Sequence, residues 1–249
     1  LQILAGLARD KKTAQLVNVL PSERPQDAYQ VVAEVAKWNC PDSVKNKLDR
    51  KCVKRTVMTI PYNAKPFSNR SYIKDAFLEK GIEIDKDDLT ITVKAVRDAM
   101  SRVVPGPMKV MKWIEDEVAK AIKRGVKELT WTTPSGFVVV QRIMKRKVEV
   151  IELKLLGRCQ MSVATEETGE VDRSRHKAAT APNLIHDSVL CRATDMTHLS
   201  HVVREVYMHL FAENDYLTDF ANQIGAETKP PIIGDLEPAT VIDSTYFFC

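Results

Sequence analysis

The sequence predicts a mostly α-helical chain with short β-hairpins, an α+β fold in which helices dominate. Apolar residues recur at helical spacing over long stretches, as Val110, Ile114 and Val118 do within residues 108–124. After residue 128 the pattern changes to short runs of β-branched and aromatic residues around turn signals such as Pro134. The chain has 249 residues, 44% of them hydrophobic and 28% charged, which is ordinary for a globular protein with a proper core.

Prolines and charged runs divide the helical part of the chain. Pro25 is expected as the first residue of the second helix, where its missing N–H costs nothing. Pro61 should kink or end the third helix, and residues 105–107 should separate the fifth from the sixth. Residues 45–51 and 85–88 are expected as charged connectors. The expected helices are residues 1–9, 25–38, 50–62, 69–80, 89–100, 108–124, 196–212 and 215–224.

Two hairpins are expected between the sixth and seventh helices. Residues 129–133 should pair with residues 136–140, and residues 148–155 with residues 160–163, because each pair of apolar runs flanks a turn signal. The polar residues 165–175 are expected to form a loose tip. The three tryptophans, Trp38, Trp113 and Trp131, are expected in the core.

Bulk charge and cysteine content exclude little. The 37 basic and 33 acidic residues leave a net charge of +4, so any case for nucleic-acid binding must rest on local patches. Five scattered cysteines without a Cys-x-x-Cys pair favour reduced thiols over a disulfide framework. No apolar run is long enough to span a bilayer, so we expect no membrane association. Because Leu1 opens directly in an apolar, helix-like run, we expect a fragment of a longer protein.

The spacing of Arg50, Lys54, Met58 and Tyr62 is the most informative pattern in the chain. Residues four apart in a helix lie on one face. Guanidinium and ammonium groups suit phosphates, and the thioether and ring that follow suit a base and a sugar. The face therefore predicts a nucleoside triphosphate as ligand. An ordinary amphipathic helix with a solvated basic side gives the same spacing and stays the alternative.

A second candidate site is His186-Asp187-Ser188, which apolar residues flank on both sides. A carboxylate in such a setting needs a cation or a metal if it is buried. The alternatives are a Mg²⁺ site and an ordinary turn aspartate paired with a lysine or arginine.

A third cluster has helical spacing and includes His198, His201 and Glu205. It could bind a metal, but a solvated helix face is expected, because no cysteine or second cluster supports a metal site. His176 and His209 are likewise expected at the surface.

The first two motifs together resemble the single-subunit RNA polymerases of the bacteriophage T7 type, also found in mitochondria. That family has Arg-x3-Lys-x7-Tyr on a fingers helix and His-Asp-Ser in a palm hairpin. The resemblance extends over nearly the whole chain. Further segments that resemble the family are residues 17–29, 131–137, 181–183 and 243–249.

The resemblance implies the fingers and part of the palm of a right-hand polymerase. On this basis residues 1–25 are a palm remnant and residues 26–140 the fingers. Residues 141–183 are the promoter-specificity hairpin region, and residues 184–249 contain the second palm motif and the C-terminal helices.

The resemblance also assigns roles to single residues. Arg50 and Lys54 would hold the incoming triphosphate. Tyr62 would gate the template base and sense the ribose 2′-OH, with Met58 packed near the nascent base pair. Lys54 and Tyr62 therefore count as catalytic, and His186 as substrate-binding.

Asp187 is the implied catalytic and metal-binding residue, as a ligand of Mg²⁺. The implied base-reading positions lie on the second hairpin, where glutamine can recognise adenine and glutamate can accept from cytosine. These positions are Val150, Glu152, Gln160 and Ser162.

The implied reaction is template-directed ribonucleotidyl transfer with two Mg²⁺ ions. The implied partners are promoter and template DNA, the nascent RNA and NTPs, and we expect a monomer. For a bacteriophage enzyme the expected location is the cytoplasm of an infected bacterium, with the mitochondrion as alternative.

Two departures from the family pattern matter. The Asp-Gly-x3-Gly motif with the other metal-binding aspartate is absent from the 249 residues. Residues 181–188 fuse two family segments, Ala-Pro-Asn-x-x-His and Ile-His-Asp-Ser, so we expect a deleted helix between them. The chain alone is therefore expected to be inactive.

Two alternatives remain open. One is a non-catalytic, nucleic-acid-binding remnant of a polymerase. The other is a fragment of a family A DNA polymerase, which shares Arg-x3-Lys-x7-Tyr. That family has phenylalanine at the position of Met58 and glutamate at that of Ser188, so both residues favour RNA synthesis.

Overall fold

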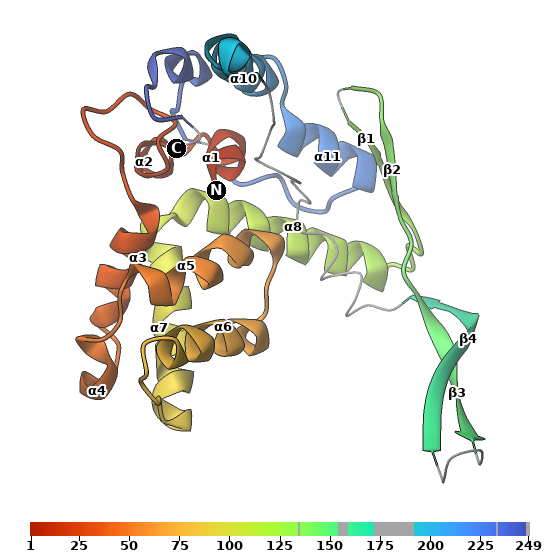
Figure 1. Cartoon of the computed structure of the whole chain (residues 1–249). Coiled ribbons are helices and arrows are strands. Elements are labelled where there is room, and N and C mark those ends of the chain that lie inside the picture. Colours follow the sequence, from red (N-terminus) through yellow and green to blue (C-terminus); the bar gives the residue numbers. More distant parts are fainter. Residues whose placement is uncertain (134, 154–158, 172–191, 233, 248–249) are drawn as a thin grey trace.

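Packed helices form most of the molecule, and one long antiparallel ribbon projects from them (Figure 1), which confirms the predicted mostly α fold. The computed structural model describes residues 1–133, 135–153, 159–171, 192–232 and 234–247, with the backbone path alone for residues 150–153 and 159–166. Among the helices described, none is both long and apolar enough to cross a bilayer.

The two ends of the chain pack together. Helix α1 (Gln2–Ala8) and α2 (Lys11–Leu16) lie against α10 (Met196–Ala212) and the 3-10 helix η3 (Pro238–Asp243). Gly6 allows this approach, because a Cβ there would lie 2.6 Å from the ring of Phe211. The hydroxyl of Tyr207 donates to the carbonyl of Gln2 at 3.0 Å, and that of Ser244 to the carbonyl of Asn18 at 2.8 Å. Residues more than 200 apart in sequence thus share one core.

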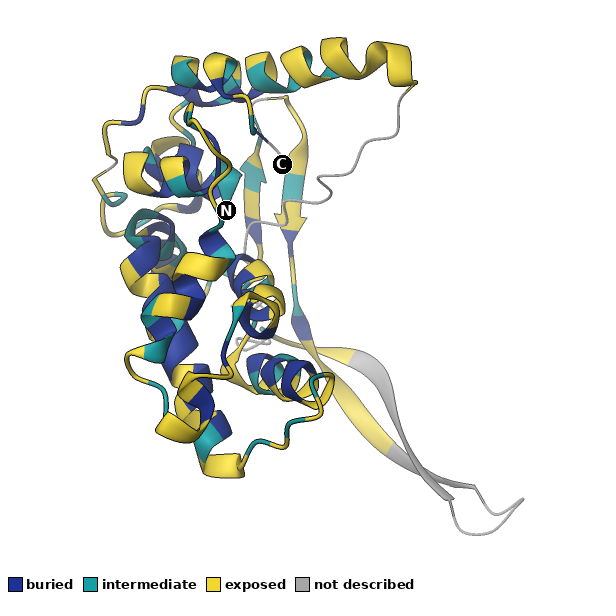
Figure 2. Ribbon diagram, turned by 60° about the vertical axis from the view of Figure 1, so that its left-hand side comes forward, coloured by how far each residue is buried: buried dark blue, intermediate teal, exposed yellow. Residues whose placement is uncertain are grey.

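A second core lies among helices α3 to α7. Their bounds are α3 (Ala28–Lys37), α4 (Asp42–Lys45), α5 (Arg50–Thr59), α6 (Pro66–Leu78) and α7 (Lys86–Val103), with the 3-10 helix η1 (Ile60–Tyr62) after α5. Each helix contributes an apolar face, and Figure 2 shows buried residues on the inner sides of these helices. Buried side chains of this core include Val32, Val53, Val57, Ile73, Phe77, Val96 and Met100.

Helix α8 (Pro105–Lys123) connects the two parts and packs beside α11 (Tyr216–Ile224). The short hairpin of β1 (Leu129–Thr132) and β2 (Val138–Gln141) packs against α11. The ring of Phe220 makes edge contacts with Trp113 and Trp131 at centroid distances of 6.4 and 5.6 Å. A further 3-10 helix, η2 (Ala193–Asp195), leads into α10.

Glu117 fixes α8 to the chain after α11. Its fully buried carboxylate accepts from the ammonium of Lys120 at 2.7 Å, the hydroxyl of Thr228 at 2.5 Å and the N–H of Glu227 at 2.6 Å. Burial raises the pKa of Glu117, but these donors outweigh it and lower the pKa from 4.5 to about 2. The carboxylate is therefore charged in the folded protein at neutral pH.

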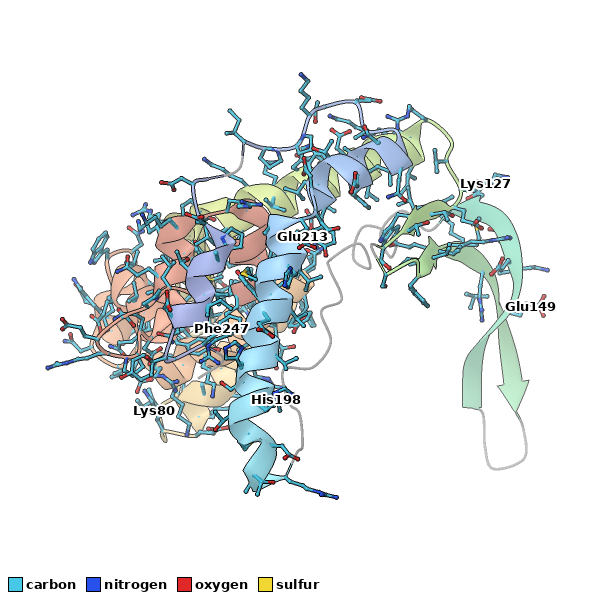
Figure 3. The ribbon with its side chains drawn as sticks, turned by 90° about the horizontal axis from the view of Figure 1, so that it is seen from above. Lys80, Lys127, Glu149, His198, Glu213 and Phe247 are labelled. Carbon is cyan, nitrogen blue, oxygen red and sulfur yellow. The ribbon has the colours of Figure 1, made fainter. Side chains whose placement is uncertain are left out.

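The projecting ribbon consists of β3 (Met144–Leu153) and β4 (Cys159–Val171), paired antiparallel. The register is irregular between Met144 and Val148 and regular beyond. Exposed ion pairs join the strands, such as Lys145 with Glu170 at 2.9 Å. Figure 3 shows Glu149 on the ribbon, well away from the helices.

Several predicted helix starts are wrong, because capping aspartates set where these helices begin in the structure. Helix α3 begins at Ala28 instead of Pro25, since Asp27 accepts from the backbone N–H groups of its first turn. Residues 85–88 are not a loop, because Asp85 caps α7 and the helix begins at Lys86. Asp10 caps α2, a helix that the sequence analysis missed.

Prolines account for a second group of errors. Pro66 and Pro105 stand in the first turns of α6 and α8, so these helices begin earlier than expected. Helix α4, which was not expected, ends at Lys45, the first residue of the expected connector 45–51, whereas α5 begins at Arg50 as predicted.

Two further predictions, on a strand and on a tryptophan, are also wrong. The strand β4 continues to Val171, where a loose tip was expected. Trp38 is 69% exposed and so lies outside the core, whereas Trp113 is buried as predicted and Trp131 is half-buried.

Candidate functional site

Helix α5 presents the predicted cationic face to solvent. Asp49 caps the helix by accepting from the N–H of Cys52 at 3.1 Å, which sets where the helix begins. One side of the helix packs into the core through Val53 and Val57. The opposite side places four side chains at the surface. These exposed side chains are Arg50, Lys54, Met58 and Tyr62.

Arg50 and Lys54 lie against the same aromatic ring on α3. The guanidinium carbon of Arg50 is 5.2 Å from the ring centroid of Tyr29, and the ammonium of Lys54 is 6.0 Å from it. Both distances are within the range of cation–π attraction. The two cations therefore sit side by side, as a polyanionic ligand would require.

Asp27 holds Arg50 from the other side. Its Oδ2 accepts from Nε of Arg50 at 2.5 Å. Partial burial raises the pKa of Asp27, but the N–H of Gln30 and the guanidinium of Arg50 outweigh it, and the pKa is lowered. No local sequence pattern links Asp27 or Tyr29 to this site, because they lie more than 20 residues before the α5 face.

Tyr62 lies where α5 changes into a 3-10 turn. The α-helix ends at Thr59, Pro61 is buried, and Asn63 adopts the left-handed conformation with φ of 62°. The α-helix thus ends two residues before Pro61, which confirms the predicted break at this proline. Met58 and Tyr62 are 47% and 52% exposed, so both remain accessible at the far end of the cationic face.

The structure does not place the second motif. His186, Asp187 and Ser188 lie outside the described residues, as do residues 181–183 and His176. In the described part of the chain, no group of three or more His, Cys, Asp or Glu side chains could hold a metal ion. A metal site beside α5 therefore has no described ligand set.

The histidines of α10 lie at the surface, as expected. Nδ1 of His201 is 3.2 Å from Oε1 of Glu205, and Nδ1 of His209 is 2.7 Å from Oε1 of Glu213; all four side chains are largely exposed. Figure 3 shows His198 and Glu213 on this helix. These are ordinary pairs between successive turns of a solvated helix.

The four predicted base-reading positions are neighbours in the ribbon. The backbone register pairs Val150 with Ser162 and Glu152 with Gln160. The ribbon extends away from the helices (Figure 1). A two-stranded ribbon of this kind can enter the major groove of DNA.

Comparison with known proteins agrees with the predicted resemblance. A sequence model described as DNA-dependent RNA polymerase matches residues 1–188. The chain is 29% identical to "DNA-directed RNA polymerase 3, chloroplastic" of Nicotiana sylvestris, covering all of this chain and 30% of that protein. It is 29% identical to "DNA-directed RNA polymerase 2A" of Nicotiana tabacum, covering all of this chain and 88% of that protein. It is 28% identical to "DNA-directed RNA polymerase 1, mitochondrial" of Arabidopsis thaliana, covering all of this chain and 30% of that protein.

These findings decide two of the open expectations. The relatives are RNA polymerases, which goes against the family A DNA polymerase alternative. The expected bacteriophage origin and location in an infected bacterium are wrong, because these relatives are plant proteins and two are named for chloroplast or mitochondrion.

The length of the alignments bears on the expected deletion. The alignment with the chloroplast protein runs over 299 positions, which exceeds the 249 residues of this chain by 50. The relative therefore has at least that many residues without a counterpart here. A missing helix between Asn183 and His186 would account for part of the difference.

Proposed function

Because the chain belongs to the DNA-dependent RNA polymerase family, we propose that the whole protein synthesises RNA from ribonucleoside triphosphates on a DNA template. The observation that carries this proposal is the exposed face of α5, where two cations stand side by side and an aromatic hydroxyl lies at the far end. The chain spans 30% of the length of the chloroplast and mitochondrial relatives, so other parts of the enzyme would complete the site.

On this proposal, Arg50 and Lys54 bind the triphosphate of the incoming nucleotide. A planar guanidinium and a compact ammonium together can contact several phosphate oxygens and neutralise the charge that develops in phosphoryl transfer. The ring of Tyr29 lies beside both cationic groups, and Asp27 pairs with Nε of Arg50, so both neighbours limit where the guanidinium can lie.

Tyr62 would contact the sugar and the template base, and Met58 would pack near the nascent base pair. Both side chains are exposed two or more helical turns beyond Arg50. A hydroxyl held there can recognise the ribose 2′-OH by hydrogen bonding, because that group both donates and accepts.

We propose Mg²⁺ as the metal of the reaction, with Asp187 as one of its ligands and His186 close to the substrate. The metal would neutralise charge on the phosphates. The described residues contain no cluster that could hold a metal ion, and both His186 and Asp187 lie outside them.

The ribbon of β3 and β4 would bind promoter DNA through Val150, Glu152, Gln160 and Ser162. Its support is the backbone register, which makes these positions two adjacent cross-strand pairs. The partners would then be promoter and template DNA, nascent RNA and NTPs. The names of the relatives favour a chloroplast or mitochondrion as the place of action.

Lys54→Ala in the whole protein tests this assignment. Loss of a preorganised cation at the phosphates should lower kcat/KM for NTPs by about 100-fold, because electrostatic stabilisation of this kind contributes that much in other active sites. Promoter binding, measured by fluorescence anisotropy, should stay unchanged. Lys74→Ala is the matched control, since Lys74 is an exposed lysine on the neighbouring helix α6. Equal NTP kinetics in wild type and Lys54→Ala would refute the role.

A non-catalytic remnant of a polymerase is the second candidate. The observation that favours it is the shortfall of at least 50 residues against the chloroplast relative within the aligned region. Magnesium-dependent incorporation of NTPs by the whole protein would exclude this candidate. Template binding without incorporation would support it.

A further inference from the structure

The segment that follows Tyr62 returns the chain from α5 to α6. It comprises residues 63–65, because η1 ends at Tyr62 and α6 begins at Pro66. The left-handed Asn63 reverses the chain, and the N–H of Ala64 donates to the carbonyl of Thr59 at 3.1 Å. The N–H of Asn63 also donates to the carbonyl of Ile60 at 2.8 Å, so local bonds close the helix end, and contacts from other helices act on the carbonyl of Ala64 that follows.

Arg97 on α7 supplies such a contact. Its Nη1 donates to the carbonyl of Ala64 at 2.9 Å and to Oδ1 of Asn69 at 2.6 Å. Arg97 is half-buried, and Asn69 is fully buried in α6. A hydrogen bond from a charged donor in a partly dry setting holds its acceptor more firmly than a neutral one in water.

The same arginine also orients the amide of Asn69. Nδ2 of Asn69 is buried and has no hydrogen-bond partner among the described residues, so the bond from Arg97 to Oδ1 is the polar contact that fixes this side chain. Arg97 thus joins the turn after Tyr62 to the first helical turn of α6. Loss of the guanidinium would leave both acceptors without this donor.

An ion pair also fixes the turn to α8. The ammonium of Lys65 lies 3.1 Å from Oε1 of Glu115 and also donates to Oδ1 of Asn63. Burial lowers the pKa of Arg97, and the nearby carboxylate of Glu115 opposes that effect. Glu115 is therefore close enough to act on both cations, and α7 and α8 together hold the turn.

From these contacts we propose that Arg97 is a positioning residue for Tyr62. By fixing the carbonyl of Ala64, two residues further along, it holds the tyrosine hydroxyl where it can distinguish a ribose from a deoxyribose. Arg97 does not contact the nucleotide. The inference rests on the proposed role of Tyr62 and names a buried support for it.

The test compares ribonucleotide and deoxyribonucleotide incorporation by the whole protein. Arg97→Met keeps an unbranched side chain of similar length but removes the guanidinium donors. The ratio of kcat/KM for NTP to kcat/KM for dNTP should then fall by about 10-fold. Misplacing a group in an active site by about 1 Å has effects of this order or larger. Arg97→Lys keeps the charge but loses the planar fork, and the ratio should fall less. Arg102→Met is the matched control: Arg102 is an exposed arginine of the same helix, and its substitution should leave the ratio unchanged.

Tyr62→Phe separates failure of this inference from failure of the proposed function. If Tyr62→Phe leaves the ratio unchanged, the proposed role of Tyr62 fails and the inference fails with it. If Tyr62→Phe lowers the ratio but Arg97→Met and Arg97→Lys do not, the inference alone is overturned. If Arg97→Met lowers kcat/KM equally for NTP and dNTP, Arg97 has a purely structural role, and the inference is also overturned. Should Arg97→Met fail to fold, as judged by its thermal unfolding, Arg97→Lys decides.

Discussion

In the helices α3 to α7, the exposed face of α5 lies directly over fully buried side chains such as Val53 and Val57. In the ribbon of β3 and β4, by contrast, all described side chains from Lys145 to Glu149 are exposed. The α5 face also has polar contacts from α3, and the turn after it has contacts from α7 and α8. The ribbon beyond its base has cross-strand hydrogen bonds and exposed ion pairs.

The difference indicates two ways of presenting a functional surface. Side chains on a packed helix are held in place by the core beneath them, which suits contacts to a triphosphate at one geometry. A ribbon whose two strands are held together by cross-strand hydrogen bonds can bend as a unit, which suits docking into a groove of DNA. Three predictions test this contrast, in order of decreasing expected effect.

Phe77→Ala should have the largest effect on stability. Phe77 is fully buried among α3 to α7, and removing its ring should lower the free energy of unfolding by about 3–5 kcal/mol. Val148→Ala is the comparison in the ribbon, where the side chain is 60% exposed and the change should stay within about 0.5 kcal/mol. Urea unfolding at equilibrium measures both. Similar losses at the two positions would contradict the contrast.

Glu117→Gln should have the next largest effect on the free energy of unfolding, and this effect should depend on pH. The pKa of Glu117 in the folded chain, about 2, lies below its ordinary value of 4.5. The charged form therefore stabilises the fold above about pH 4.5, and this contribution of roughly 3 kcal/mol is lost as the pH falls through about 2.

The free energy of unfolding measured at several pH values tests this expectation. Between about pH 5 and about pH 3, the wild type should lose more stability than Glu117→Gln. Glu170→Gln on the ribbon should follow the wild type, because its carboxylate is exposed. Parallel pH profiles of wild type and Glu117→Gln would show that the buried carboxylate does not supply this stability.

The ion pair of Lys145 and Glu170 should have the smallest effect. Both side chains are more than half exposed, and exposed pairs typically contribute about 0.2–1 kcal/mol or less. A double-mutant cycle with Lys145→Ala and Glu170→Ala should give a coupling energy at the low end of that range. A coupling well above it would mean that ion pairs hold the ribbon in place.

Local patterns predicted much of the helical part of the chain. The helix expected over about 196–212 is present as α10, whose apolar residues keep helical spacing. The first hairpin also formed where Pro134 predicted a turn. The predicted starts of α3, α6, α7 and α8 were wrong, because an aspartate cap or a first-turn proline set the boundary and both are compatible with a loop as well. The predicted burial of Trp38 was wrong, because large apolar residues are not always buried. The spacing of apolar residues does not show which side of a helix a neighbouring element covers.

Helical spacing and the missing N–H of proline act over a few residues, so the sequence alone predicted the exposed face of α5 and the end of the helix near Pro61. Its motifs also led to the correct family. Only the tertiary structure decided which residues hold that face in place: Asp27 and Tyr29 at Arg50, and Arg97 at the carbonyl of Ala64. These partners are separated by 21 to 33 residues. They meet because the helices bury their apolar sides against one another, and that packing, rather than any local spacing, sets which polar groups come within hydrogen-bonding distance.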